Sequence, residues 1–182
     1  MSRKYKFFEK SELYFVTFAV VNWIDVFTRD IYREVLLDSW KYCMEHKGLR
    51  IYAWCIMTNH VHMIISSDKN EIYEIVRDTK SFTSTTLKTV IAENPQESRK
   101  EWLLWMMKRA GIKNKNNKVF QFWQQHNHPI LLDSNKLMDQ KLDYIHNNPV
   151  KAGFVNEPEH YVYSSARDYA GMKGLIDIEI IE

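Results

Sequence analysis

The sequence is poor in the residues that interrupt or cross-link a fold. Its 182 residues include only five glycines, four prolines and two cysteines. These counts exclude a collagen-like or low-complexity chain and a disulfide-dense scaffold. Cys43 and Cys55 stand among apolar residues, which predicts buried thiols in a reducing compartment. Hydrophobic residues make up 45% of the chain, enough to build a single domain over residues 1–182.

Long apolar runs are also missing. No stretch approaches the roughly 18 apolar residues of a membrane span. Residues 1–15 contain no continuous apolar segment of the kind found in signal peptides. We therefore expect a cytoplasmic protein that has no membrane partner.

A large charge of one sign is absent as well, since the net charge is only +2. This value neither requires nor excludes a nucleic-acid partner. Basic residues gather instead in residues 108–118 (KRAGIKNKNNK) and in the first ten residues. Either patch can contact phosphates or be an ordinary solvated segment. Aromatic residues reach 14%, with six tryptophans, and they serve either base stacking or core packing.

The order of hydrophobic patterns predicts an α+β fold. Runs of β-branched and aromatic residues predict strands, and apolar residues at three- and four-residue spacing predict helices. The expected strands are 13–21, the two arms of a hairpin within 51–66 that turns at 58–59, and 128–132. The first expected helix is capped at Thr28 or Asp30 and stops at Gly48. The others are 70–92, 97–110 and a last helix from 133 or 134 to 148, where Pro149 limits continuation.

This order of elements matches a ferredoxin-like split βαβ antiparallel sheet with an additional C-terminal helix. Residues 94–118 are interpreted as a helical insertion plus a basic loop. Residues 156–182 are interpreted as a C-terminal extension of the same domain.

Two histidines stand within the hairpin, in the run His60-Val61-His62. Residues two apart on a strand point to the same face, so the imidazoles project side by side at roughly 7 Å between Cα atoms. Two imidazoles in this position can share one metal ion. Alternatively, both rings are ordinary polar positions on the wet face of a half-buried strand.

The last helix carries a second candidate. Tyr144 and Asn148 fall together on the flank of its apolar stripe, near Lys141. A phenol there can present its hydroxyl to a groove, and Asn148, one turn on, can offer a carbonyl oxygen to the same point. For a lone tyrosine, the simpler interpretation is a boundary residue of an amphipathic helix. His146 points away from Asn148, which predicts a surface or packing role.

Several motifs in order resemble one family. His60-Val61-His62 follows an apolar strand, Phe122-Trp123-Gln124 comes later, and residues 144–155 (YIHNNPVKAGFV) precede residues 163–169 (YSSARDY). This combination resembles the single-tyrosine HUH transposases, specifically the REP-associated tyrosine transposases. The resemblance implies a ferredoxin-like fold whose C-terminal helix carries the tyrosine, and an enzyme that cuts and rejoins single-stranded DNA near hairpins. Residues 97–118 have no counterpart in the shortest family members, so no role carries over to them.

By the same resemblance, Tyr144 is the catalytic nucleophile, His60 and His62 are metal ligands, and Asn148 is a third ligand. A tyrosine hydroxyl has a pKa of about 10 and is a weak nucleophile at neutral pH. A divalent cofactor, Mg²⁺ or Mn²⁺, would stabilise charge at the phosphate. The expected product is a 5′-phosphotyrosine and a free 3′-hydroxyl, which preserves the bond energy for rejoining.

The expected partner is single-stranded or hairpin DNA in the nucleoid, and a homodimer is left open. Basic side chains are the candidates for phosphate contacts. They are Lys80, Lys88, Lys113, Lys115, Lys118, Lys141 and Arg167. Lys80 and Lys88 lie on one side of a predicted helix, which equally fits a solvent-facing surface.

Two other classes of protein stay open. One is a domesticated protein that binds hairpin DNA without transposition. The other is a metal-dependent phosphoesterase in which the tyrosine is structural and water attacks. A second pair, His126 and His128, repeats the spacing of the first, but Pro129 follows it, so a rigid strand that presents both rings is less expected.

Overall fold

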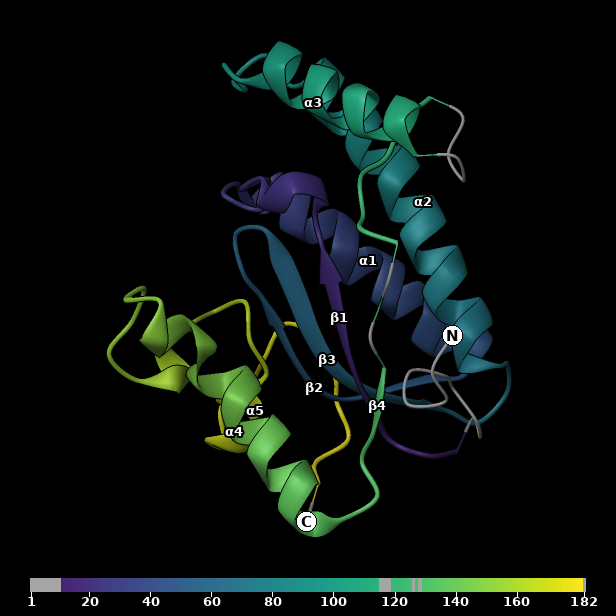
Figure 1. Cartoon of the computed structure of the whole chain (residues 1–182). Coiled ribbons are helices and arrows are strands. Elements are labelled where there is room, and N and C mark those ends of the chain that lie inside the picture. Colours follow the sequence, from purple (N-terminus) through teal and green to yellow (C-terminus); the bar gives the residue numbers. More distant parts are fainter. Residues whose placement is uncertain (1–10, 115–118, 126, 128, 182) are drawn as a thin grey trace.

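The chain forms a four-stranded sheet with helices on both faces (Figure 1). The computed structural model describes residues 11–114, 119–125, 127 and 129–181. The strands are β1 (Tyr14–Ala19), β2 (Leu49–Ile56), β3 (His60–Ser67) and β4 (Ile130–Leu131). The helices are α1 (Asp30–Lys47), α2 (Ile72–Glu93), α3 (Lys100–Lys113), α4 (Asn135–Lys151) and α5 (Ala166–Tyr169), with short 3₁₀ turns η2 (Val21–Trp23) and η3 (Pro158–His160). None of the helices in the described ranges is both long and apolar enough to cross a bilayer.

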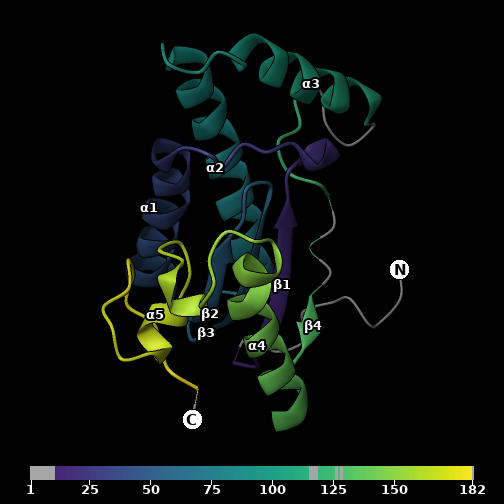
Figure 2. The same cartoon turned by 90° about the vertical axis from the view of Figure 1, so that its left-hand side faces the viewer.

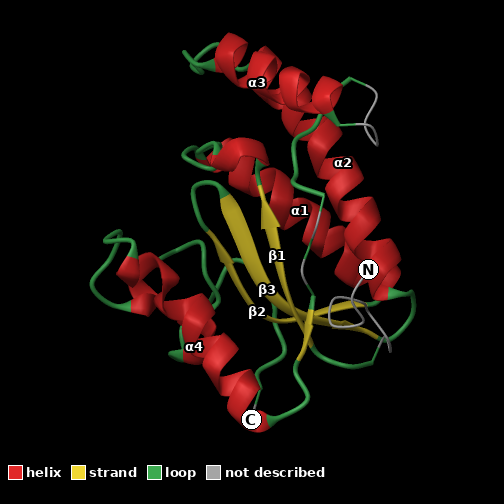
Figure 3. Cartoon of the chain, in the orientation of Figure 1, coloured by secondary structure: helices red, strands yellow, loops and turns green. Residues whose placement is uncertain are grey.

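The strand order is β2-β3-β1-β4, and every neighbouring pair is antiparallel (Figure 3). The connection from β1 to β2 runs through α1, and the connection from β3 to β4 includes α2. This topology confirms the predicted split βαβ sheet. Pairing of β1 with β3 sets Thr17 opposite His62 and Ala19 opposite His60.

Helices α1 and α2 cover one face of the sheet, and α4 lies on the other (Figure 2). Alternation along β1 divides its side chains between two cores. Val16 and Phe18 lie in the larger core with α1 and α2, whereas Phe15 lies in a smaller apolar cluster with Ile145 of α4. Thr17 therefore shares the α4 face with Phe15, and its strand partner His62 lies on that face too.

The segment that follows α4 ties this helix to the sheet. Ser164 pairs with Cys55 of β2. The Ser165 hydroxyl donates to Trp54 O at 3.3 Å, so His146 Nε2, 2.9 Å from the same oxygen, is the donor in their hydrogen bond. Burial lowers the pKa of His146 to about 4, which keeps the ring neutral at pH 7. His146 is thus a packing residue that anchors α4.

Helix α4 runs through Pro149, so the expectation that it stops at Asn148 was wrong. Proline removes only one backbone donor, and here it stands in the last turn, where few hydrogen bonds follow. Gly153, with φ of +76°, ends the helix instead. Its N–H donates to Val150 O and the Phe154 N–H donates to Pro149 O, both at 2.9 Å, which are the two bonds of a Schellman motif. The longer helix includes Lys151.

Other boundaries also differ from those expected. Strand β1 is Tyr14–Ala19, shorter than the expected 13–21. Strand β4 is limited to Ile130–Leu131, shorter than the expected 128–132, whose first residue lies outside the described residues. Helix α3 runs from Lys100 to Lys113 rather than over 97–110, and a turn around the buried Glu97 precedes it.

A buried carboxylate holds that turn in place. Glu97 is 1% exposed. It accepts hydrogen bonds from Arg99 Nε at 3.1 Å, Arg29 Nε at 3.4 Å and the Tyr32 hydroxyl at 3.3 Å. Arg29 and Tyr32 lie at the start of α1, so Glu97 connects the start of α3 to the start of α1, at the end of the molecule from which α3 extends (Figure 1).

We expect Glu97→Gln to lower the free energy of unfolding by about 2 kcal/mol at neutral pH, because a neutral amide replaces a buried charged acceptor. Burial raises the pKa of the Glu97 carboxyl, but hydrogen bonds and charge from Arg99, with the charge of Arg29, together hold that pKa below its ordinary value. The carboxylate therefore stabilises the fold above its unfolded-state pKa, and this contribution is lost as pH falls through the lower folded-state pKa.

Urea denaturation of Glu97→Gln and wild type over a range of acidic to neutral pH measures this effect. The exposed Glu101→Gln in the first turn of α3 is the control and should change stability little. Equal stability of Glu97→Gln and wild type at neutral pH would contradict the expectation.

Candidate active site

The histidine pair lies at the start of β3, directly after the hairpin turn. Met57 N donates to His60 O at 2.8 Å and closes this turn. Alternation along β3 buries Val61 in the core under α1 and α2 and puts both imidazoles on the α4 face. The two ring centroids are 4.7 Å apart, so the rings stand side by side, as the strand spacing predicts.

A chain of hydrogen bonds fixes the tautomer of His60. Asn59 Nδ2 donates to Trp23 O at 3.1 Å, so the amide oxygen of Asn59 is the atom that faces His60 Nδ1, at 2.7 Å. An amide oxygen only accepts, and His60 Nδ1 must therefore carry the hydrogen. Burial lowers the pKa of His60. The neutral ring then has its lone pair on Nε2, the atom that can bind a metal ion.

His62 is 5% exposed and held on two sides. Its Nδ1 is hydrogen-bonded to Thr17 Oγ1 at 2.8 Å, and Phe15 stacks on the ring with centroids 5.4 Å apart. Burial, followed by the charges of His60 and Lys141, lowers the pKa of His62 to about 3. The ring is therefore neutral at pH 7.

The other nitrogen of His62 is unpaired. Nε2 is buried and has no hydrogen-bond partner within the described part of the chain. A buried polar atom without a partner costs about 1–3 kcal/mol of stability. Such a cost is expected where the atom has a function. Coordination of a metal ion by Nε2 would satisfy this nitrogen, and the donor set of two neutral imidazoles fits such an ion.

Tyr144 of α4 lies against this pair. The centroid of its ring is 5.0 Å from that of His62 and 6.0 Å from that of Phe15. The residue is 40% exposed, so a substrate can reach it. The packing of α4 on the sheet thus brings the predicted nucleophile to the predicted metal ligands, although they lie far apart in the sequence.

Two lysines flank the tyrosine ring. Lys141 Nζ lies 5.7 Å from the ring centroid of Tyr144 and 4.8 Å from that of Phe15. Lys151 Nζ lies 6.0 Å from the Tyr144 centroid. Attraction to the aromatic faces keeps both ammonium groups near the tyrosine. Their charge favours a phosphodiester at this point.

Asn148 lies one helical turn after Tyr144 and is half-buried. Across the described ranges, no three or more His, Cys, Asp or Glu side chains are grouped so that they could hold a metal ion. Among the described residues, a third protein ligand beside His60 and His62 would therefore be of another type. The amide oxygen of Asn148 is the candidate that α4 supplies, and its ligand role stays a prediction.

Lys80, a predicted DNA contact, is used inside the fold. Its Nζ donates to Gln124 O and to Asn127 Oδ1, both at 2.6 Å. Burial lowers the pKa of Lys80 to about 8. The side chain thus ties α2 to the segment that runs beside β1, and a DNA contact would compete with these bonds.

Lys141 is the predicted DNA-contact residue that lies beside Tyr144, and the others that the structure describes are spread over the molecule. Lys88 of α2 and Lys113 at the end of α3 are exposed, and Arg167 of α5 is half-buried. The remaining residues singled out in the sequence lie outside the described residues: Lys115, Lys118, His126 and His128.

Sequence reasoning missed several residues that support the site. Phe15 and Thr17 hold His62, Asn59 holds His60, and Lys151 flanks Tyr144. The alternation of β1 places Phe15 and Thr17 on one face, but only the pairing of β1 with β3 shows that His62 is their neighbour. Asn59 precedes the histidine motif directly, and this adjacency is a signal that the sequence does contain.

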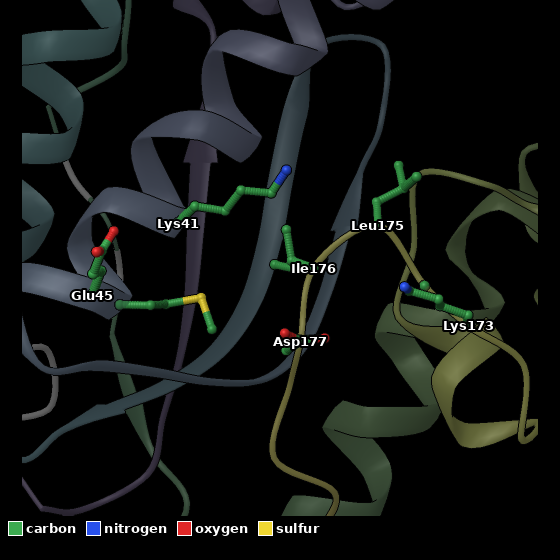
Figure 4. A pocket seen from close by; sticks show the side chains of 8 residues that line it. Lys41, Glu45, Lys173, Leu175, Ile176 and Asp177 are labelled. Carbon is green, nitrogen blue, oxygen red and sulfur yellow. The ribbon is translucent and has the colours of Figure 1, made fainter.

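A separate open pocket of about 500 Å³ lies between α1 and the C-terminal segment (Figure 4). Lys41 and Glu45 of α1 line it together with Leu175, Ile176 and Asp177. Its lining residues include neither the histidines nor Tyr144, so it is not part of the candidate active site.

A ferredoxin-like sheet that presents two histidines on one face to a tyrosine on a C-terminal helix defines the class of single-tyrosine HUH transposases. The chain belongs to the IS200-like transposase family, because the sequence model of the family described as "Transposase IS200 like" matches residues 11–108. It is therefore a tyrosine transposase, an enzyme that cleaves and transfers DNA. The matched residues include the histidine pair and end before α4.

Known proteins resemble most of the chain. It is 27% identical over 169 residues to a Haemophilus influenzae protein named "Putative REP-associated tyrosine transposase", covering 91% of this chain and 85% of that protein. An uncharacterised protein of the same species is 26% identical over 151 residues, covering 75% of this chain and 79% of that protein. A solved structure of a REP-associated tyrosine transposase bound to a REP hairpin aligns with 100% of this chain and 94% of its own, with a TM-score of 0.66 and 18% identity. The last comparison supports the fold.

Proposed function

We propose that this transposase cleaves and rejoins single-stranded DNA next to hairpins, with Tyr144 as the nucleophile and a 5′-phosphotyrosine as the intermediate. One observation carries the proposal: the tyrosine ring lies 5.0 Å from the ring of His62, whose buried Nε2 has no hydrogen-bond partner in the described residues. The structural relative that was solved with a REP hairpin supports hairpin DNA as the class of substrate.

The proposed cofactor is Mg²⁺ or Mn²⁺, held by Nε2 of His60, Nε2 of His62 and the amide oxygen of Asn148. When bound there, the ion would act as a Lewis acid that stabilises charge on the scissile phosphate. Both ions take oxygen ligands, and Mn²⁺, the softer of the two, accepts imidazole nitrogen more readily than Mg²⁺ does.

The chain's own residues orient the reaction. Lys141 and Lys151 bind the phosphate beside Tyr144 and align it for in-line attack. The Tyr144 hydroxyl loses its proton to solvent as its oxygen bonds to phosphorus, and the bond to the 3′-oxygen of the upstream nucleotide breaks. That oxygen leaves as a hydroxyl after taking a proton from solvent. Attack by a 3′-hydroxyl on the phosphotyrosine reverses these steps and rejoins the strand.

The experiment that tests this function uses hairpin oligonucleotides with randomised single-stranded flanks and a fluorescent label at the 3′ end. After incubation with the protein and Mn²⁺, a labelled species should migrate with the polypeptide in denaturing electrophoresis. The same oligonucleotides labelled at the 5′ end should give only shortened free DNA. Cleavage without a covalent species would identify water as the nucleophile and replace this proposal by a phosphoesterase.

Asn59 should act as a positioning residue for His60. We expect Asn59→Ala to weaken Mn²⁺ binding by roughly 10- to 100-fold, the usual effect of losing a residue that orients a metal ligand. Asn59→Asp keeps an acceptor for His60 Nδ1 and should retain most of the affinity. Calorimetric titration with Mn²⁺ measures both variants, with the exposed Asn70→Ala as control. Wild-type affinity in Asn59→Ala would contradict the role.

A further inference from the structure

The turn at the end of β1 contains an unusual tryptophan. Asn22 and Trp23 of η2 have φ angles of +56° and +55°. Left-handed backbone is rare for a bulky residue and costs of order 1–3 kcal/mol. Trp23 is nevertheless 56% exposed, so burial of its indole in the core does not offset this cost. Residues with such strained backbone cluster at active sites and ligand-binding sites.

This ring is connected to the active site. The Trp23 indole lies against His60 in an edge contact, with ring centroids 5.7 Å apart and planes at 75°. Trp23 O accepts the hydrogen bond from Asn59 Nδ2, and Asn59 in turn holds His60 Nδ1. The indole is therefore held at a defined position on the rim of the histidine pair.

We propose that Trp23 is a base-stacking residue, which binds the nucleobase next to the phosphodiester that Tyr144 attacks. The inference rests on the proposed function and adds to it a binding position for one nucleotide of the single strand. Tyr144, with its two lysines, contacts His62, whereas Trp23 contacts His60, the other member of the pair. A strand that crosses the pair brings a base to the indole.

The chemistry of the surface favours a base as the occupant. An indole offers a flat apolar face that stacks on any of the four bases, and such contacts are sequence-tolerant. The edge contact with His60 positions the ring before DNA arrives, which lowers the conformational entropy lost on binding. Trp23 should therefore raise affinity and fix the position of the strand, rather than select one base.

The test begins with Trp23→Asn, because asparagine tolerates left-handed backbone and keeps the turn while removing the ring. Its melting temperature should not fall below that of wild type. Its Kd for a fluorescent oligothymidine, measured by anisotropy, should rise roughly 5- to 150-fold, the loss that corresponds to one stacked base. Trp23→Phe should recover part of the affinity. Trp105→Ala removes a tryptophan of similar exposure, 53%, from α3 and should bind as wild type does.

A scan with abasic sites separates stacking from support of His60. In the hairpin that wild type converts best to the covalent species, single bases are removed one at a time. When the base at one position next to the cleaved phosphate is missing, the affinity of wild type should fall to that of Trp23→Asn. The two proteins should then bind this abasic DNA equally. If Trp23→Asn binds DNA more weakly than wild type but no abasic position makes the two affinities equal, the stacking role is wrong and Trp23 only supports His60.

Formation of the covalent species by wild type separates a failure of the stacking role from a failure of the proposed function. If wild type forms no such species with any hairpin, the proposed function fails, and the stacking role fails with it. If wild type forms the species and Trp23→Asn binds oligothymidine as tightly as wild type, the proposed function stands and the inference about Trp23 is wrong.

Discussion

Tyr144→Phe should abolish both strand cleavage and the covalent protein–DNA species. The substitution removes one oxygen and keeps the ring that contacts His62 and Phe15. The free energy of unfolding should change by no more than about 1 kcal/mol, the net value of an ordinary hydrogen bond. Binding of hairpin DNA should be retained, because Lys141 and Lys151 remain. Denaturing electrophoresis with 3′-labelled DNA, together with anisotropy, measures each of these results.

Tyr42→Phe is the matched control, since Tyr42 is also a half-exposed tyrosine on a helix, at 55% exposure on α1. It should cleave as wild type does. Cleavage by Tyr144→Phe would remove this residue from the nucleophile role. If peptide mapping of the wild-type adduct found the DNA on Tyr163 or Tyr169, the reaction class would stand and the site would move.

His62→Leu should eliminate cleavage without loss of stability in the metal-free protein. Leucine replaces a buried ring whose Nε2 is unpaired, and removing such an atom recovers about 1–3 kcal/mol. Loss of the Thr17 hydrogen bond to Nδ1 offsets part of this gain. Without the ligand, cleavage should fall roughly a thousandfold or more, because Lewis-acid stabilisation contributes several kcal/mol to the barrier.

Thermal denaturation with and without Mn²⁺ provides a readout that does not depend on cleavage. Mn²⁺ should raise the melting temperature of wild type, since a ligand that binds only the folded state stabilises it. The His62→Leu protein should show no such increase, and the exposed His46→Leu on α1 should respond as wild type does. A normal Mn²⁺ response in His62→Leu would show that the ion binds elsewhere.

Local patterns predicted the sheet, and they predicted the orientation of the candidate site residues within their own strand and helix. Strand periodicity alone placed His60 and His62 on the same face, because a strand repeats every two residues whatever its partners are. The helical phase of α4 likewise placed Tyr144 on the edge of the apolar stripe. The contact between these two segments could not be predicted from local patterns, because the packing of α4 on the sheet sets the distance between them.

The residues that the sequence did not predict depend on non-local pairing or on competing local signals. Thr17 supports His62 only through the register of β1 and β3. Pro149 and Gly153 both signal the end of a helix, and Gly153 determines the actual end because its two Schellman bonds satisfy the last carbonyls. The prediction that α4 ends before Pro149 made the helix too short and left out Lys151, whose Nζ lies 6.0 Å from the ring centroid of Tyr144.

With Tyr144 as the proposed nucleophile, the anchoring of α4 by Ser165 has a consequence for the order in which the site forms during synthesis. A ribosome delivers the chain from its N-terminus, and structure forms as segments emerge. The histidines appear first, the tyrosine much later, and the serine that fixes the tyrosine helix through His146 and Trp54 later still. We therefore expect chains that end before residue 165 to hold α4 less firmly against the histidines and to cleave DNA poorly.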